Sequence, residues 1–165
     1  MWLPGFWQRG KTDMGNIEYR KAGKEDIELL MSSRLEMLRV VNGLEEDTPF
    51  DEVLIEESRR YFEEGDQTTV LALDSGRVIG CATICYIRMM PTYSHPTGHR
   101  AHLMNVYTAA EYRRQGIARH MMEMILDDAR RHGATEISLD ATESGRPLYE
   151  SMGFADSDEC MVLVL

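Results

Sequence analysis

Residues 112–119 (YRRQGIAR) place positive charge and hydrogen-bond donors around one glycine. The donors are Arg113, Arg114, Gln115 and Arg119. Guanidinium and amide N–H groups suit phosphate oxygens better than a neutral ligand. Gly116 has no Cβ, so a ligand oxygen could approach the backbone closely there. The residue types and their spacing therefore predict a site for an anion, typically a phosphate.

Two elements would position this segment. Residues 102–108 (HLMNVYT) have the apolar and β-branched composition of a strand, and residues 117–131 have the apolar spacing of a helix. A helix that begins directly after the glycine would point unpaired N–H groups and the positive end of its dipole at the anion. The glycine spacing matches neither the dinucleotide-binding loop nor the P-loop. A plain turn with solvated arginines is the alternative interpretation of this segment alone.

The remaining elements predict an α+β domain. Further strands are expected at residues 17–20, 68–73, 78–87, 135–140, 154–155 and 159–165, and further helices at residues 25–41, 48–64 and 148–152. Residues 88–99 are too irregular for either. This order predicts a mixed sheet with helices on its faces.

The composition excludes several classes of function. A chain of 165 residues suits one domain, and its net charge of −10 argues against nucleic acid as the main partner. No apolar run is long enough to span a bilayer, so we expect no membrane partner. Three cysteines do not make a disulfide framework, and Cys81 and Cys85 suit the core of a protein in a reducing, cytoplasmic compartment.

Residues 1–14 are expected to be an N-terminal extension of a single domain at residues 15–165. Both tryptophans lie in this segment, but Pro4 and Gly5 interrupt it, and it lacks the long apolar region of a signal peptide. An arm that packs on a neighbouring chain and sequence ahead of a natural start at Met14 are alternatives. A homodimer is an open expectation, since the tryptophans and the closing strands are apolar surfaces that a partner could cover.

Two motifs resemble the GCN5-related N-acetyltransferase (GNAT) family. The pattern Arg113-x-x-Gly116-x-Ala118 is similar to the loop that binds the acetyl-CoA pyrophosphate in that family. Residues 148–154 (LYESMGF) are similar to its C-terminal helix, in which a tyrosine is followed four residues later by Gly-Phe. Residues 106–113 resemble the family's lead-in to the loop, and the element order of residues 15–165 also agrees.

The resemblance implies a GNAT-like, mostly antiparallel mixed sheet of about seven strands with about four helices. It also implies a transferase that moves an acetyl group from acetyl-CoA to a primary amine by direct attack in a ternary complex. The acceptor would be a small molecule or a peptide, selected by the first two helices and the loop at residues 89–99. The implied cofactor-binding residues are Val106, Tyr107, Thr108, Arg113, Arg114, Gln115, Gly116, Ile117, Ala118, Arg119 and Thr142.

Tyr149 is the implied catalytic acid. A phenol with an ordinary pKa of about 10 is protonated at neutral pH and can donate to a departing thiolate; a packing tyrosine is the alternative. The chain departs from the family pattern in three places. Arg114 and Ala118 stand where glycine is frequent, and Thr142 stands where asparagine is common, which weakens one hydrogen bond to pantetheine.

The general base, which would accept the proton of the attacking amine, is less well defined by the sequence. The strand at residues 102–108 contains no Asp or Glu, and Glu111 lies past its end. The proton of the amine could instead be taken by a water that Asn105 holds or by His102, or the amine could arrive already neutral. His95, His99 and His102 are interrupted by proline and glycine, and we expect no metal.

Two functions from other classes remain alternatives to the enzyme. One is a catalytically silent domain that binds or senses CoA with the same fold. The other is an unrelated α+β domain in which the loop pattern is accidental.

Overall fold

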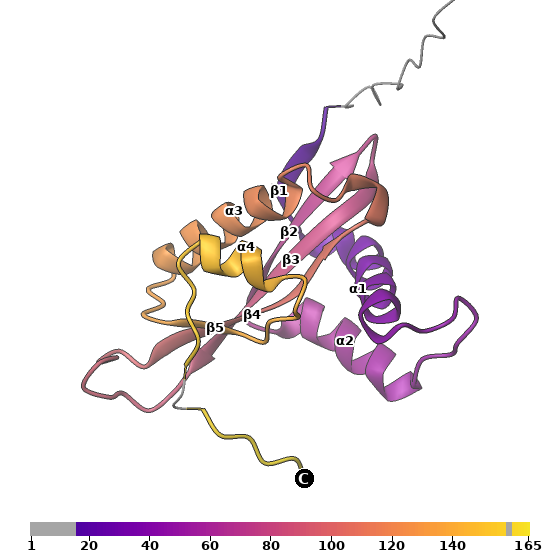
Figure 1. The fold of residues 1–165 in the computed structure, drawn as a ribbon. Helices are drawn as coiled ribbons and strands as arrows, with labels where there is room; N and C mark the ends of the chain where they lie inside the picture. Colours follow the sequence, from indigo (N-terminus) through magenta and orange to yellow (C-terminus); the bar gives the residue numbers. More distant parts are fainter. Residues whose placement is uncertain (1–15, 158–159) are drawn as a thin grey trace, which may run out of the picture.

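A sheet in the order β1-β2-β3-β4-β5 separates two pairs of helices in the computed structural model, which describes residues 16–157 and 160–165 (Figure 1). The strands are β1 (Glu18–Lys21), β2 (Gln67–Asp74), β3 (Arg77–Arg88), β4 (His99–Thr108) and β5 (Ile137–Leu139). The helices are α1 (Ile27–Asn42), α2 (Glu52–Glu64), α3 (Ile117–Arg131) and α4 (Arg146–Ser151), with short 3-10 turns at Lys24–Asp26 and Ala110–Tyr112. The α+β class and the mixed sheet are confirmed, because β4 and β5 are parallel and the other pairs antiparallel.

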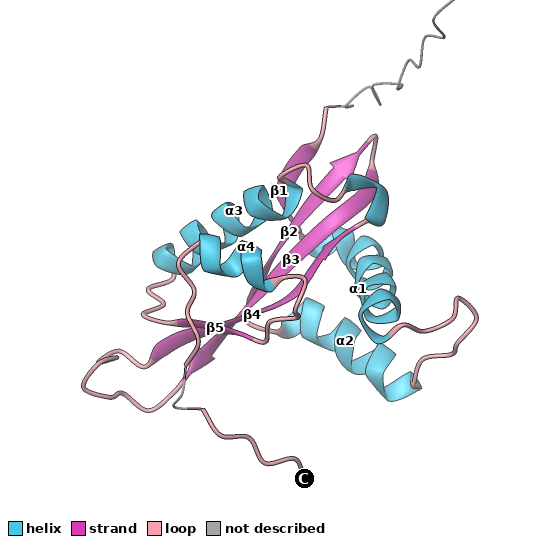
Figure 2. Ribbon diagram, in the orientation of Figure 1, coloured by secondary structure: helices cyan, strands magenta, loops and turns pink. Residues whose placement is uncertain are grey.

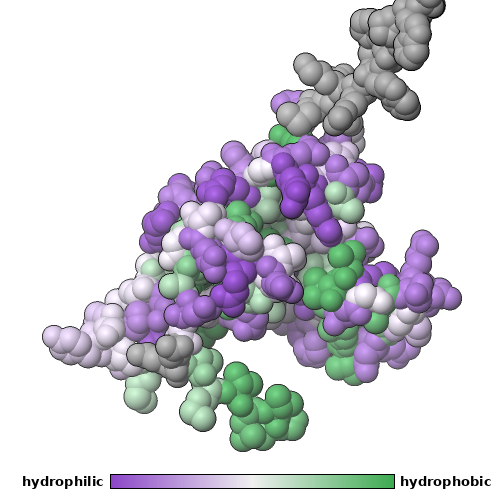
Figure 3. All heavy atoms as spheres, viewed as in Figure 1, coloured by the Kyte–Doolittle hydropathy of each residue, from purple (hydrophilic) through white to green (hydrophobic). Residues whose placement is uncertain are grey.

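The prediction of about seven strands is wrong for the described residues, which form five. Residues 154–157 and 160–165 follow α4 as irregular chain, and the side chains from Met161 to Leu165 are exposed (Figures 2 and 3). Their apolar, β-branched composition does not suffice to make them a strand, because a strand requires a neighbouring strand to pair with. The predicted extension at residues 1–14 lies outside the described residues.

The second helix begins later than expected. Its predicted start at Thr48 is wrong, because the Asp51 carboxylate accepts a hydrogen bond from the N–H of Val53 at 2.8 Å and caps α2. This arrangement satisfies one of the free donors at the helix start. Within the described residues, no helix has the length and apolar character needed to cross a bilayer.

Two cores lie on opposite faces of the sheet because successive strand side chains point to opposite sides. On one face, Val70, Ala82 and Ile84 pack with α3, mainly with Met121 and Ile125. On the other face, Leu71, Leu73 and Cys81 pack against Leu30 of α1. Cys81 and Cys85 are buried free thiols, as predicted for core residues. These cores fix α3 and α1 against opposite faces of the sheet.

β4 is the strand that opens the sheet. It pairs with β3 along most of its length, but with β5 only from Ala101↔Ile137 to Leu103↔Leu139. Asn105 then takes a left-handed conformation, with φ 57°, where the register with β3 shifts. No described strand pairs with the β5-side edge of residues 104–108. That edge leaves backbone donors and acceptors available to a ligand.

A buried carboxylate holds α3 to the sheet. Asp128 accepts hydrogen bonds from Thr68 Oγ1 at 2.6 Å and from the Tyr86 hydroxyl at 2.9 Å, and it forms an ion pair with Lys21. Burial alone would raise the pKa of Asp128, but the hydrogen bonds from these three partners lower it below its ordinary value. The charged form is therefore the one that stabilises the fold.

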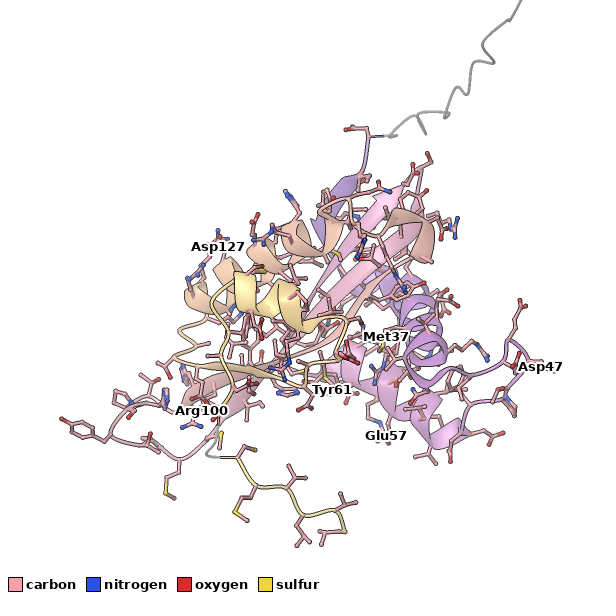
Figure 4. All side chains as sticks on the ribbon, viewed as in Figure 1. Met37, Asp47, Glu57, Tyr61, Arg100 and Asp127 are labelled. Carbon is pink, nitrogen blue, oxygen red and sulfur yellow. The ribbon has the colours of Figure 1, made fainter. Side chains whose placement is uncertain are left out.

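Asp128→Asn is expected to lower the free energy of unfolding by about 2–3 kcal/mol, because buried donors and Lys21 lose a charged acceptor. The adjacent Asp127, an exposed residue paired with Arg131, is the matched control (Figure 4). Asp127→Asn should change stability by less than about 0.5 kcal/mol. Urea titrations of the two variants test this, and equal losses would contradict it. Since the folded pKa is depressed, the stabilisation is present at neutral pH and lost as the pH falls below the ordinary aspartate value.

Candidate active site

The loop between β4 and α3 forms an open cradle of backbone N–H groups. Arg114 and Gly116 both take left-handed conformations, with φ 60° and 83°, and such turns direct successive N–H groups toward one point. Among the described residues, the structure shows no acceptor for the N–H groups of residues 114–119, and the first bonded amide is His120, which donates to the Gly116 carbonyl at 3.0 Å. A Cβ built on Gly116 would meet no atom within 4 Å. The mouth of the cradle is therefore unobstructed.

Three arginines lie in or directly beside the loop that forms this cradle. Arg113, Arg114 and Arg119 are exposed, and none forms an ion pair with an acidic side chain in the described part of the chain. Arg113 Nε donates to the Thr108 carbonyl at 3.0 Å, and Arg119 Nη2 donates to Ser151 Oγ at 2.6 Å, which joins α3 to α4. In a protein of net charge −10, a local excess of unpaired positive charge favours an anionic ligand here.

The other residues of the predicted loop have different environments. Gln115 Nε2 donates to the Glu111 carbonyl at 3.2 Å, leaving its backbone N–H free. Ile117 is 2% exposed and packs in the core, so only its N–H can serve a ligand. Ala118 is half-buried behind it.

The end of β4 adds a buried polar group without a partner. Thr108 Oγ1 is buried and forms no hydrogen bond with any described residue. Val106 packs on the α3 side of the sheet, whereas the Tyr107 hydroxyl lies on the α1 side, 3.5 Å from Glu36 Oε1. Tyr107 can therefore contribute to a ligand on the α3 side only through its backbone. An unpaired buried hydroxyl is costly unless a ligand satisfies it.

Tyr149 lies on α4, against the same core as Val106. Its ring packs edge-on to Phe154 at 6.0 Å between centroids, and burial raises the pKa of its hydroxyl. No described residue forms a hydrogen bond with this hydroxyl. Thr142 Oγ1 accepts the N–H of Gly145 at 3.2 Å and so supports the turn that starts α4.

Gly145 is a residue of this site that the sequence did not single out. A Cβ on Gly145 would lie 2.9 Å from Cε2 of Tyr149, closer than van der Waals contact allows. Glycine at this position therefore permits the tyrosine to fold back over its own turn. In the sequence, the only sign of this role is that the glycine directly precedes Arg146-Pro147, at the end of a predicted loop.

A cavity of about 480 Å³ lies on the opposite face of the sheet. Residues of α1, α2, β3 and β4 line it, including Glu57 and Tyr61 of α2, which Figure 4 labels. Of the residues considered as sources of a base, His102 and Asn105 both line it. The two predicted specificity helices contribute to its wall, whereas residues 89–99 contribute none of the lining side chains.

Among the described residues, no group of three or more His, Cys, Asp or Glu side chains is arranged to hold a metal ion. His95 Nε2 lies 3.2 Å from Glu136 Oε2, and His102 Nδ1 lies 2.8 Å from Ser138 Oγ. Both rings are therefore held by residues in or next to β5.

Comparison with known proteins agrees with this geometry. Residues 36–154 match the model of the acetyltransferase (GNAT) family. A predicted acetyltransferase from Clostridium acetobutylicum, crystallised with acetyl-CoA, is 33% identical, with a TM-score of 0.81 over 90% of this chain and 96% of that one. A GCN5-related N-acetyltransferase from Ralstonia eutropha JMP134 has the same fold, with a TM-score of 0.72 at 23% identity over 90% of this chain and 98% of that one. Glucosamine 6-phosphate N-acetyltransferase of Trypanosoma brucei brucei is 27% identical over 158 residues, which are 93% of this chain and 99% of that protein.

Proposed function

The chain belongs to the acetyltransferase (GNAT) family, and from that premise we propose that it moves an acetyl group from acetyl-CoA to a primary amine. The observation that carries the proposal is the open cradle of residues 114–119, together with the unpaired arginines in or directly beside it. A pyrophosphate is the ligand that satisfies both its amides and its charge. Thr108 Oγ1 and the unpaired edge of β4 supply further groups for the pantetheine amides.

In the proposed reaction, the amine lone pair forms a bond to the thioester carbonyl carbon, and the carbon–sulfur bond breaks. Backbone N–H groups at the β4 bulge stabilise the negative charge that develops on the carbonyl oxygen. Tyr149 donates its proton to the departing thiolate, which restores the thiol. Since burial raises the pKa of Tyr149, this hydroxyl stays protonated throughout the neutral and mildly alkaline range.

The proton lost by the amine leaves through water rather than through a carboxylate on β4. Asn105 is the polar residue at the bulge that can orient such a water, and its side chain is itself held by Thr83 Oγ1 at 3.2 Å. An amine that arrives neutral needs only this relay. The reaction rate should therefore rise with pH as the amine acceptor loses its proton.

Two measurements test the proposal. Acetyl-CoA should raise the melting temperature, by mass action, at concentrations well above its Kd. A panel of amines with thiol detection should then show release of CoA. Failure to bind acetyl-CoA would contradict the proposal, whereas binding without turnover of any amine would favour a catalytically silent CoA-binding domain.

We further propose a homodimer in which the exposed apolar segment at residues 161–165 packs on a second copy. Its side chains, Met161 to Leu165, form the apolar patch at the C-terminal end in Figure 3. Deletion of residues 161–165 is expected to convert a dimer into a monomer, measured by light scattering with the full chain as the control. A full chain that is monomeric at micromolar concentration would refute the dimer.

A further inference from the structure

The cavity under α2 has walls that are mostly apolar. Leu54 and Phe62 come from α2, Ile87 from β3 and Met104 from β4. A space of about 480 Å³ with such walls suits an apolar group of moderate size. Polar side chains such as Ser58, Thr83 and Asn105 also line the cavity, but a sugar or a polycationic amine would still place hydroxyl or ammonium groups against these apolar walls.

A half-buried arginine interrupts this apolar surface. Arg34 lies on the stripe of α1 that faces the sheet, four residues after Leu30 and three before Met37, both buried. Its guanidinium is half-buried and lines the cavity. Burial lowers the pKa of Arg34 from its ordinary value, yet a guanidinium stays charged at neutral pH. The guanidinium therefore keeps its positive charge although burial opposes it.

Arg34 has no anionic partner in the described part of the chain. Its one hydrogen bond joins Nη1 to Asn105 Oδ1 at 3.4 Å, which is long for such a bond. Glu57 also lines the cavity, but it is exposed and already accepts a hydrogen bond from Arg60 at 2.7 Å. His102 is engaged by Ser138. A half-buried guanidinium without a carboxylate is stabilised when a ligand supplies one.

The position of Arg34 sets where that carboxylate would lie. Asn105, its partner, is the left-handed bulge residue of β4, two residues beyond the last pair of β4 with β5. This is the point at which the strand edge opens toward the proposed thioester. An anion at Arg34 would thus lie close to the amine that reacts, while the rest of the acceptor fills the apolar cavity.

We propose that the acceptor is an α-amino acid with an apolar side chain, whose carboxylate is bound by Arg34 and whose side chain occupies the cavity. This inference rests on the proposed acetyltransferase function. It selects L-phenylalanine, L-leucine and L-methionine as probes over polycations and phosphorylated sugars. Arg34 is a binding and specificity residue in this scheme. It takes no part in the bonds that form and break, which are those of the proposed transfer.

The first test pairs each amino acid with the amine that lacks only its carboxylate. L-Phenylalanine is compared with 2-phenylethylamine, and L-methionine with 3-(methylthio)propylamine, at saturating acetyl-CoA and over a range of pH that removes the difference in amine pKa. We expect kcat/KM to be about 100-fold higher for the amino acid of each pair. Equal values, or turnover of glucosamine 6-phosphate alone, would overturn the proposal.

The second test uses Arg34→Gln, with Arg59→Gln as the matched control. Arg59 lies on α2 but pairs with Glu28 outside the cavity, at 2.8 Å. Arg34→Gln should lower kcat/KM for L-phenylalanine about 100-fold and that for 2-phenylethylamine less than about threefold, and Arg59→Gln should change neither by more than about threefold. Equal losses with both substrates would show that Arg34 acts on structure rather than on the carboxylate.

A binding measurement separates this inference from the proposed function. Calorimetry with N-acetyl-L-phenylalanine, the expected product, requires no chemistry. Loss of this binding in Arg34→Gln, with acetyl-CoA affinity unchanged, supports the carboxylate site. Failure of acetyl-CoA to bind contradicts the proposed function, whereas turnover of the decarboxylated amines without any effect of Arg34 contradicts the carboxylate site alone.

Discussion

Tyr149→Phe is expected to lower the rate of acetyl transfer in a single turnover by about 100-fold, because the departing thiolate loses its proton donor. The Kd for acetyl-CoA should change by less than about threefold, since the hydroxyl forms no hydrogen bond in the described residues and the ring remains in place. A single-turnover measurement separates the chemical step from product release. An unchanged rate would remove Tyr149 from the proposed mechanism.

Tyr19→Phe is the matched control for this substitution. Tyr19 lies on β1, packs against the same core as Tyr149, and has its pKa raised by burial in the same way. Its hydroxyl also forms no hydrogen bond with a described residue. Removal of this hydroxyl should leave both rate and affinity within about threefold of the unmodified protein. A similar loss in both variants would indicate altered packing rather than proton transfer.

Gly116→Asp is expected to weaken acetyl-CoA binding by at least about 100-fold. A carboxylate at this position would stand in the cradle of residues 114–119, where the pyrophosphate is proposed to bind, and two like charges at about 4 Å repel by several kcal/mol at a protein surface. The fold should tolerate the change, because a Cβ there meets open space and aspartate is among the residues that accept a left-handed backbone. Calorimetry with acetyl-CoA measures the loss.

Two further variants separate charge from bulk and from backbone strain. Gly116→Asn has nearly the size of Gly116→Asp without its charge, so it should retain most of the affinity that the aspartate removes. Gly43→Asp places the same side chain at another open, left-handed glycine, at the end of α1, with φ 60°. It should leave acetyl-CoA binding unchanged. Unaltered affinity in Gly116→Asp would contradict the pyrophosphate site itself.

Much of the proposed site could be inferred from the sequence because its signals are local. The arginines, Gly116 and the helix that follows are consecutive in the sequence, and a helix start leaves its own first N–H groups unpaired whatever surrounds it. Tyr149 was predicted from the resemblance of residues 148–154 to the C-terminal helix of the GNAT family, and its role as the acid stays a prediction. The conformations of Arg114 and Gly116 then agree with an open loop.

Tertiary contacts decided the features that the sequence did not indicate. Arg34 was not singled out from the sequence, and its place in the cavity wall depends on contact with Asn105, 71 residues later in the chain. The pairing of β4 with β5 over only three residues, which opens the strand edge, depends on how two segments separated by α3 meet.

Residue types and their spacing in the sequence therefore predicted which side chains could bind phosphate, and the apolar periodicity predicted most helices and strands. Only the tertiary structure decided where the sheet opens, which face holds the cavity, and that the apolar residues at positions 161–165 have no strand beside them. The physical reason is that propensity and hydrogen-bond chemistry act between near neighbours in the chain. Strand pairing, cavities and buried charges depend instead on which distant segments pack together.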